Sequence, residues 1–337
     1  MKKILVTGGL GFIGSHTVVE LQNEGYEVVI IDNLSNTTIA VLDNIISITG
    51  ITPTFANIDL RNQKAVGDFF DNHTIDGVIH FAAFKAVGES VGSPLVYYQN
   101  NLNTLIYLLQ ELTVRKIDNF IFSSSCTVYG QADSLPITEK APVKPAESPY
   151  GYSKQAGEII LRDSCKASEL NAISLRYFNP IGAHPSIKIG ELPLGVPQNL
   201  IPYITQTAAG LRGELSVFGD DYPTKDGTAV RDYIHVVDLA KAHISALGRL
   251  IHKENKSNYE FFNVGSGTGS SVLEVIKAFE KASGKPLRYK IVGRREGDVT
   301  AAYADTTLAN KELKWKTTLS LDDALASAWQ WQLAQEK

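Results

Sequence analysis

Lys3-Ile4-Leu5-Val6-Thr7-Gly8-Gly9-Leu10-Gly11-Phe12-Ile13-Gly14 stands near the start of the sequence and decides the fold. The apolar run from Lys2 to Thr7 predicts a short buried strand that a glycine-rich turn closes. From residue 12 to residue 23 the apolar side chains fit one face of a helix. Gly8, Gly11 and Gly14 lie three apart at this junction, where glycine permits a tight turn and a close approach of the backbone to a pyrophosphate.

The same alternation of strand and helix continues through the first half of the chain. Nearly continuous apolar runs predict strands at 27–31, 54–57, 77–80, 120–122 and 172–175, and helical patterns fill 66–70, 97–112 and 153–165. Strands of this kind belong to a parallel sheet covered on both faces. The predicted fold class is therefore α/β, a doubly wound parallel sheet of the Rossmann type.

The second half of the chain contains more loop-forming residues than the first. Prolines and glycines cluster in 179–202 and 218–227, which predicts loops, with a clear strand only at 258–264 and a clear helix at 272–282. We expect residues 1–178 to form a dinucleotide-binding domain and residues 179–337 mainly a smaller C-terminal substrate-binding domain. Segments near 232–264 are expected to return to the large sheet.

An acidic residue at the end of the second predicted strand indicates the cofactor. Asp32 stands 18 residues after Gly14, where its carboxylate accepts hydrogen bonds from adenosine ribose hydroxyls and repels a 2′-phosphate. The glycine spacing together with Asp32 favours NAD over NADP.

The composition excludes several classes of function. The 337 residues carry a formal net charge of −4, which gives no electrostatic reason to expect a nucleic acid or an anionic membrane as partner. Two cysteines, Cys126 and Cys165, provide neither a disulfide framework nor a cysteine-rich metal site, and no metal is expected. The N-terminal apolar run is too short for a signal peptide, and the expected location is the cytoplasm.

A tyrosine and a lysine four residues apart are the candidate catalytic pair. Tyr150 and Lys154 fall at the start of a predicted helix, where this spacing places both side chains on one face. A neighbouring ammonium stabilises the phenolate, so that a tyrosine can act as a base. Ser123, Ser124 and Ser125 stand at the carboxyl end of a buried strand, where doubly wound folds bind ligands.

These motifs resemble those of a known enzyme family. Thr7–Gly14 (TGGLGFIG), Ser123–Gly130 (SSSCTVYG) and Pro149–Lys154 (PYGYSK) are similar to the signatures of the extended short-chain dehydrogenases. The segments that resemble the UDP-glucose 4-epimerases in particular are Phe81–Ser90 (FAAFKAVGES), Arg176–Pro180 (RYFNP), the run from Asp221 to His235 and Arg294–Asp298 (RREGD). The resemblance covers nearly the whole chain.

The resemblance implies a reaction and three catalytic roles. A hydride leaves carbon 4 of the hexose for NAD while Tyr150 removes the proton of the 4-hydroxyl, and the 4-keto sugar then turns and takes the hydride back on its other face. Lys154 binds the nicotinamide ribose and lowers the pKa of Tyr150. Ser125 hydrogen-bonds the reacting oxygen. A UDP-hexose, UDP-glucose or UDP-galactose, is the implied substrate.

The resemblance also implies two sets of binding residues. Those for the cofactor are Gly8, Gly11, Phe12, Ile13, Gly14, Asp32, Asn33, Leu34, Ser35, Asn36, Thr37, Asp59, Leu60, Phe81, Ala82, Ala83, Phe84, Lys85, Asn100, Ser125, Tyr150, Lys154 and Phe178. Those for the substrate are Lys85, Ser125, Tyr150, Asn179, Asn199, Leu200, Phe218, Arg231, Arg295, Asp298 and Ala302. Arg231 and Arg295 would supply the bidentate donors that a diphosphate prefers.

Two finer expectations come from the same resemblance. Relatives restricted to simple hexoses carry a tyrosine four residues beyond the aspartate that matches Asp298, and Ala302 stands there in this chain. The smaller side chain predicts that N-acetylated sugars, UDP-GlcNAc and UDP-GalNAc, are accepted as well. A homodimer is also implied, with 97–112 and 153–165 forming a four-helix bundle between subunits.

Three other functions remain as alternatives. A nucleotide-sugar 4,6-dehydratase needs an acid–base pair directly after the serine that matches Ser125, and Cys126 and Thr127 stand there. A reductase of the same superfamily would exchange its cofactor, whereas an epimerase keeps it bound. A non-catalytic NAD-binding sensor would have no use for Ser125, Tyr150 and Lys154, and this chain carries all three.

Overall fold

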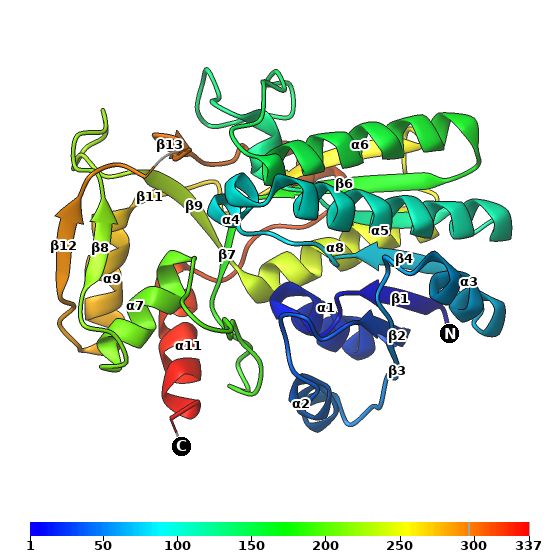
Figure 1. The fold of residues 1–337 in the computed structure, drawn as a ribbon, viewed down its shortest axis with the longest axis horizontal. Coiled ribbons are helices and arrows are strands. Elements are labelled where there is room, and N and C mark those ends of the chain that lie inside the picture. The colour runs from blue at the N-terminus through cyan, green and yellow to red at the C-terminus, as the bar shows by residue number, and fades with distance from the viewer. Residues whose placement is uncertain (296, 337) are drawn as a thin grey trace.

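A seven-stranded parallel sheet organises the molecule (Figure 1). The structure, a computed structural model, describes residues 1–295 and 297–336, and the sheet has the strand order β10-β6-β5-β4-β1-β2-β3. The strands are β1 (Lys3–Thr7), β2 (Glu27–Asp32), β3 (Thr54–Asn57), β4 (Gly77–His80), β5 (Asn119–Ser123), β6 (Asn171–Tyr177) and β10 (Tyr259–Val264). Each neighbouring pair is parallel. The predicted doubly wound α/β fold is confirmed.

Helices cover both faces of this sheet. One face packs against α1 (Phe12–Asn23), α2 (Ala40–Thr49) and α8 (Val236–Ile251), and the other against α3 (Gln63–Asn72), α5 (Pro94–Arg115) and α6 (Pro149–Ala167). Within β1, Ile4 and Val6 face the first layer and Leu5 the second. A strand buried on both sides needs apolar residues at every position, which is why these strands appear in the sequence as unbroken apolar runs.

Two helices begin earlier than their apolar periodicity predicts. α5 starts at Pro94 and α6 at Pro149, and in both cases proline occupies the first turn, where its missing amide hydrogen costs nothing. Ser148 caps α6 by accepting a hydrogen bond from the amide of Gly151. This early start places Tyr150 in the first turn of α6, beside the carboxyl end of β5.

The C-terminal part is built on two small sheets. Four strands, β7 (Asn179–Ile181), β9 (Val230–His235), β11 (Gly269–Ser271) and β13 (Ala301–Ala302), form one, and β8 (Leu215–Phe218) with β12 (Tyr289–Val292) forms the other. The helices α7 (Leu200–Ala208), α9 (Val272–Ser283) and α11 (Leu321–Ala334) share a second apolar core with them. The short elements α4 (Val87–Gly92), α10 (Thr307–Glu312) and a 3₁₀ turn (Cys126–Tyr129) complete the chain.

The two segments expected to return to the large sheet behave differently. β10 pairs with β6 at the edge of the large sheet, whereas β9 pairs with β7, β11 and β13 in the small one. β9 therefore connects the two halves without joining the large sheet. Among the described residues, no helix is both long enough and apolar enough to cross a bilayer.

Candidate active site

The β1–α1 turn is packed so tightly that only glycine fits. Gly8 has φ +67°, and a Cβ there would lie 2.8 Å from the amide nitrogen of Ala82. A Cβ on Gly14 would lie 2.1 Å from the carbonyl oxygen of Gly8. The first hydrogen bond within α1 runs from the amide of Ser15 to the oxygen of Gly11, so the amides of the first helical turn have no carbonyl of their own helix to bond. These amides are the donors that a pyrophosphate requires.

Asp32 stands at the end of β2 beside this turn. Its carboxylate accepts hydrogen bonds from the amides of Leu10 (3.1 Å) and Leu34 (2.9 Å), and Leu34 adopts φ +59° to make the second. Burial raises the pKa of Asp32, and the two backbone hydrogen bonds oppose that shift. The side chain is thus fixed at the rim of a cavity, where a ribose would meet it.

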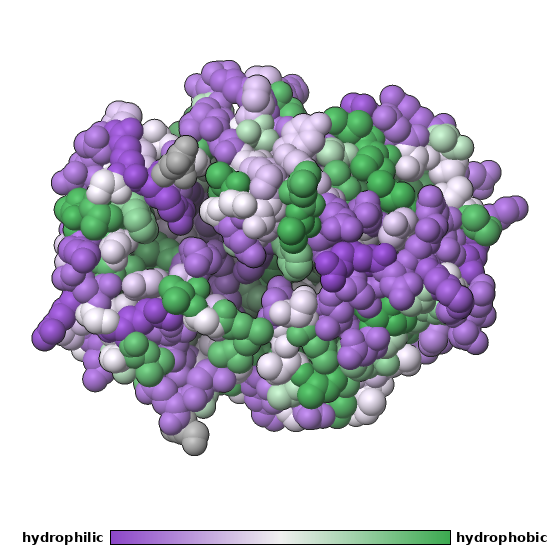
Figure 2. Space-filling view, in the orientation of Figure 1, coloured by the Kyte–Doolittle hydropathy of each residue, from purple (hydrophilic) through white to green (hydrophobic). Residues whose placement is uncertain are grey.

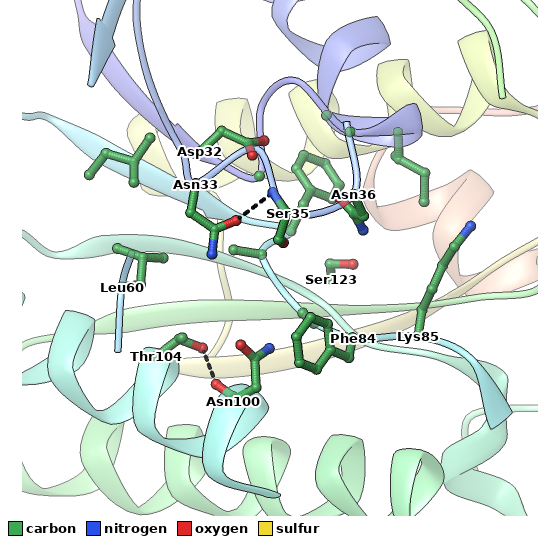
Figure 3. A pocket seen from close by; sticks show the side chains of 18 of the residues that line it. Asp32, Asn33, Ser35, Asn36, Leu60, Phe84, Lys85, Asn100, Thr104 and Ser123 are labelled. Carbon is green, nitrogen blue, oxygen red and sulfur yellow. Dashed lines mark hydrogen bonds between the residues drawn. The ribbon is translucent and has the colours of Figure 1, made fainter. Parts of the chain in front are cut away.

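This cavity follows the carboxyl ends of β1, β2, β4 and β5 (Figure 3). Asp32 and Asn33 lie across it from Asn100 and Thr104. The predicted cofactor residues that line it are Gly8, Gly11, Phe12, Ile13, Gly14, Asp32, Asn33, Ser35, Asn36, Asp59, Leu60, Phe81, Ala82, Ala83, Phe84, Lys85, Asn100, Tyr150 and Lys154. The structure therefore gathers these residues, which are spread over nearly 150 positions of sequence, around one space.

Tyr150 and Lys154 lie on the same face of α6 and are both buried. The ammonium nitrogen of Lys154 lies 5.8 Å from the centre of the Tyr150 ring and donates a 2.6 Å hydrogen bond to the carbonyl oxygen of Ser123. Burial lowers the pKa of Lys154 to about 8, and the charge of Glu158 opposes the shift. Lys154 is therefore still mostly charged at neutral pH.

The protonation of Tyr150 differs from the simple expectation. Burial raises the pKa of Tyr150, the neighbouring phenol of Tyr177 acts in the same direction, and the hydroxyl of Ser125 opposes both. The cofactor-free protein therefore holds Tyr150 as a neutral phenol at pH 7. Lys154 alone does not make it a base, because its ammonium is bonded to Ser123.

A second cleft of about 750 Å³ adjoins the first cavity and opens near α4 (Figure 2). The predicted substrate residues that line it are Lys85, Ser125, Tyr150, Asn179, Asn199, Arg231, Arg295, Asp298 and Ala302. The carboxylate of Asp298 lies 2.8 Å from Arg295 and 3.5 Å from Arg231. Tyr150, Phe84 and Lys85 border both spaces, so the phenol stands where their contents would meet.

Six predicted residues do not line the space expected of them. Ser125, predicted for both ligands, lines only the second cleft, and so do Thr37, which donates a hydrogen bond to the oxygen of Leu10, and the buried Phe178. Leu34 packs into the core beneath the turn. Neither Leu200 nor Phe218 is among the residues that line the second cleft. Leu200 packs against the C-terminal core, and the Phe218 ring lies under Arg295, 5.6 Å away.

Several lining residues escaped the sequence analysis. Thr104 lies one helical turn after Asn100, and Tyr177 shares a 2.6 Å hydrogen bond with the hydroxyl of Ser123. Glu191 reaches the second cleft from an irregular loop and binds both Lys85 (3.2 Å) and Asn199 (2.6 Å). The helical spacing offered a signal for Thr104, whereas no local pattern marks Glu191.

Ala302 faces the second cleft, and Tyr303 does not. Ala302 of β13 pairs with Arg231 of β9 and packs with Phe178. The ring of Tyr303 lies on the other side of the chain, against Gly269. The amide of Ile137 donates to the carbonyl oxygen of Tyr303 (2.8 Å) and fixes this orientation. The aromatic ring next to Ala302 therefore leaves the cleft open.

Known proteins share this fold and sequence. The family described as GDP-mannose 4,6 dehydratase matches residues 5–328. UDP-glucose 4-epimerases of Erwinia amylovora and Bacillus subtilis are each 51% identical over 98% of this chain, which spans 97% and 96% of their lengths.

Solved structures agree with these relatives. The UDP-glucose 4-epimerase of Stenotrophomonas maltophila, with bound NAD and formylated UDP-arabinopyranose, has a TM-score of 0.96 and 46% identity, with coverage of 100% of this chain and 99% of its own. That of Bifidobacterium longum, in complex with NAD+ and UDP, has a TM-score of 0.95 and 48% identity, with 99% of each chain covered. On sequence, fold and the arrangement of its cavities, the chain belongs to the UDP-glucose 4-epimerase family, within the short-chain dehydrogenase-type NAD epimerases and dehydratases.

Proposed function

We propose that the protein is an NAD-dependent epimerase that interconverts UDP-glucose and UDP-galactose through a 4-keto intermediate. The observation that carries the proposal is the position of Tyr150, which borders both the dinucleotide cavity and the arginine-lined cleft. A sugar held in the cleft and a nicotinamide held in the cavity would meet along this shared border, which Phe84 and Lys85 also line. Relatives with bound NAD and a UDP-containing ligand support this reading.

The residues around the first cavity suit NAD. The glycine turn leaves no room for a Cβ and offers the free amides of α1 to a pyrophosphate, and Asp32 offers a fixed carboxylate to a ribose. NAD, when bound, supplies the acceptor and the donor of the hydride at carbon 4 of the sugar. Lys154 would hold the ribose next to the nicotinamide once its bond to Ser123 is exchanged or shared.

The proton chemistry falls to Tyr150 and Ser125. The Tyr150 phenolate accepts the proton of the sugar 4-hydroxyl, and the Ser125 hydroxyl donates a hydrogen bond to the same oxygen as it becomes a carbonyl. Because burial raises the pKa of Tyr150, the phenolate forms only with positive charge nearby, from Lys154 and from an oxidised nicotinamide. Proton removal is thus tied to a loaded cofactor site.

Charged side chains hold the rest of the substrate. Arg231 and Arg295 offer planar donors to the diphosphate, and Asp298 keeps both guanidinium groups at the wall of the cleft. The sugar is then the part that remains free to turn. The hydride leaves one face of carbon 4 and returns to the other. The protein must therefore bind the nucleotide firmly and leave the sugar free to rotate.

The open space beside Ala302 extends the range of sugars to UDP-GlcNAc and UDP-GalNAc. Ala302 is small, faces the cleft, and has the Tyr303 ring on the far side of its strand. An acetamido group is similar in volume to the aromatic ring that a tyrosine would place there. The cleft therefore admits the 2-acetamido sugar in both orientations.

The dehydratase alternative fits the site less well. Burial raises the pKa of Cys126 to about 12, and Thr127 carries a neutral hydroxyl, so neither provides the acid–base pair that loss of water requires. Incubating the purified protein with UDP-galactose and identifying the sugar product separates the possibilities. UDP-glucose supports an epimerase, a 4-keto-6-deoxy sugar indicates a dehydratase, and no turnover indicates a sensor. NAD retained through purification argues against a reductase.

We also propose a homodimer, with α5 and α6 of each subunit forming a four-helix bundle. The two helices expose apolar side chains, among them Leu95, Tyr152 and Ile159, and the rings of Tyr98 and Tyr152 lie 5.8 Å apart. A patch of this kind across two parallel helix surfaces is typical of an interface. In a dimer, each subunit would cover the exposed apolar face of the other.

Two broader assignments complete the proposal. Residues 1–178 form the NAD-binding domain, with α8 and β10 added to it from later in the chain, and the remainder of 179–337 binds the nucleotide sugar. The protein works in the cytoplasm, which fits two free cysteines, Cys126 and Cys165, in a chain whose activity needs neither as a disulfide. Cell fractionation tests the location.

A further inference from the structure

A buried carboxylate follows Lys154 by one helical turn. Glu158 accepts hydrogen bonds from the hydroxyl of Ser124 (2.6 Å) and from the guanidinium of Arg176 (2.9 Å and 2.5 Å). Both members of the ion pair are almost fully buried. The chemistry proposed above uses neither of them.

The cost of burying these charges calls for a role other than stability. A buried ion pair loses as much by desolvation as it gains by attraction, so apolar residues would hold the fold equally well. Here the pair is embedded in a complete network, because Arg176 also bonds Tyr129 (3.0 Å) and Tyr129 bonds Asn263 (2.7 Å). Such a network fixes geometry.

The geometry that it fixes is that of the catalytic groups. Three side chains of α6 reach the end of β5 and the segment that follows it: Lys154 bonds the oxygen of Ser123, Glu158 bonds the hydroxyl of Ser124, and Gln155 bonds the oxygen of Val128. Ser125 lies inside this segment. Of the three bonds, the one from Ser124 to Glu158 is made by the residue directly before the catalytic serine.

We propose that Glu158 is a positioning residue of this active site, which holds Ser124, and with it the hydroxyl of Ser125, at the correct distance from Tyr150 and provides the counter-charge of Lys154. The proposal rests on the proposed function. It assigns to Glu158 two separable effects, one through a hydrogen bond and one through charge.

The charged and titratable groups around Lys154 make the second effect testable. Glu158 is the acidic group on its own helix, Tyr150 and Tyr177 are neutral phenols, and burial holds His80 of β4 neutral by lowering its pKa to about 3. Arg176 of β6 is cationic and is paired with Glu158. Removing the charge of Glu158 therefore removes the charge that opposes the effect of burial on Lys154, and the pKa of Lys154 falls.

Three variants separate positioning, charge and simple stability. Ser124→Ala removes one hydrogen bond but leaves Glu158 paired with Arg176, so no buried charge is orphaned. Glu158→Gln removes the charge. Tyr129→Phe is the matched control, because it breaks the same network at the far side of Arg176, away from Ser124. For each, kcat, KM for UDP-galactose, the pH profile of kcat and the melting temperature are measured on the protein with its NAD.

The expected results differ for each variant. Ser124→Ala lowers kcat by about tenfold, as expected for a displaced catalytic group, with KM and the alkaline limb of the profile unchanged. Glu158→Gln lowers kcat further and moves the alkaline limb to lower pH. Tyr129→Phe lowers the melting temperature and leaves kcat and the limb unchanged.

Some results would overturn the proposal. A wild-type kcat in Ser124→Ala, or an equal loss of kcat in Tyr129→Phe, would mean that the network stabilises the fold and does not position the catalytic groups. An unshifted limb in Glu158→Gln would remove the charge effect, and if that variant does not fold, the other two still decide the positioning. An inactive wild type overturns the proposed function itself, whereas an active wild type with these negative results overturns only the role of Glu158.

Discussion

The ammonium nitrogen of Lys154 lies 5.8 Å from the centre of the Tyr150 ring, and its shortest hydrogen bond goes to the backbone of Ser123. The pair thus forms one site without a direct hydrogen bond between its members. In the proposed mechanism Tyr150 carries the proton transfer, and Lys154 acts on it through charge and through the cofactor. The consequences can be measured separately for the two residues.

Replacing Tyr150 with phenylalanine removes the proton acceptor and keeps the ring. We expect turnover of UDP-galactose to fall by about 100-fold to 10,000-fold, the range of general acid–base catalysis. Bound NAD and the melting temperature should stay near wild type, because the ring still packs in its buried place. Turnover equal to wild type would rule out Tyr150 as the base.

The alkaline side of the pH profile reports on Lys154. Lys154 is charged below its pKa of about 8 and neutral above it, so kcat should fall as the pH rises through about 8. The fall follows because a neutral amine no longer favours the phenolate of Tyr150. The profile is measured with saturating UDP-galactose, and a kcat that stays level to pH 10 would show that the charge of Lys154 is not needed.

We expect Asp32 to set the choice of dinucleotide. Asp32→Ala should weaken NAD by about tenfold to a hundredfold, the value of a hydrogen bond to a charged group, and should reduce discrimination against NADP. Asp32→Asn is the closer comparison, because it keeps the size of the side chain and one oxygen acceptor. It loses the charge and the acceptor for one of the two amides, since Leu10 and Leu34 bond different carboxylate oxygens. An unchanged ratio of NAD to NADP affinity in both variants would place the selectivity elsewhere.

We expect Ala302 to set the range of sugars. Ala302→Tyr should lower kcat/KM for UDP-GalNAc by about tenfold to a hundredfold, as an overfilled pocket does, and spare UDP-galactose. Tyr303→Phe, which changes the ring on the opposite side of the strand, should leave both activities unchanged. A wild type without activity on UDP-GalNAc would contradict the open cleft.

The proposed dimer rests on the exposed apolar side chains of α5 and α6. Ile159→Glu places a charge in the proposed interface and should weaken self-association by about a hundredfold or more, because the carboxylate would be buried without a partner. Sedimentation velocity over a range of concentrations measures this. Lys166→Glu, at the last turn of α6, is a control for surface charge. A wild type that sediments as a monomer at every concentration would end the proposal.

Local sequence was enough for the parts of the site that adjacent elements build. The glycine turn, Asp32 and the pair Tyr150 and Lys154 each lie at a junction of one strand and one helix, and their spacing alone predicts which way the side chains face. The predicted starts of α5 and α6 lie too far along the chain, because apolar periodicity takes no account of a proline in the first turn. Helix α8 was omitted although its apolar residues recur at helical spacing.

The remainder depends on contacts between distant segments. β9 mixes apolar with charged residues (VRDYIH), and nothing in its own residues says that it pairs with β7, β11 and β13 rather than with the large sheet. Glu191 reaches Lys85 across more than a hundred residues of sequence. Ser124 was noted as part of a serine run, and its bond to Glu158 appears only when α6 is packed on β5.

The glycine at position 269 has a consequence for the choice of sugar, although it does not line the cleft. A Cβ there would lie 2.7 Å from a side-chain carbon of Val230 and 2.8 Å from the ring of Tyr303, so even alanine would press on the residue beside Ala302. The ring of Tyr303 can stay in its place, turned away from the cleft, only while position 269 has no side chain. The proposed acceptance of N-acetylated sugars therefore depends also on a residue outside the cleft. A substitution at Gly269 would reduce that acceptance without changing any residue that lines the cleft.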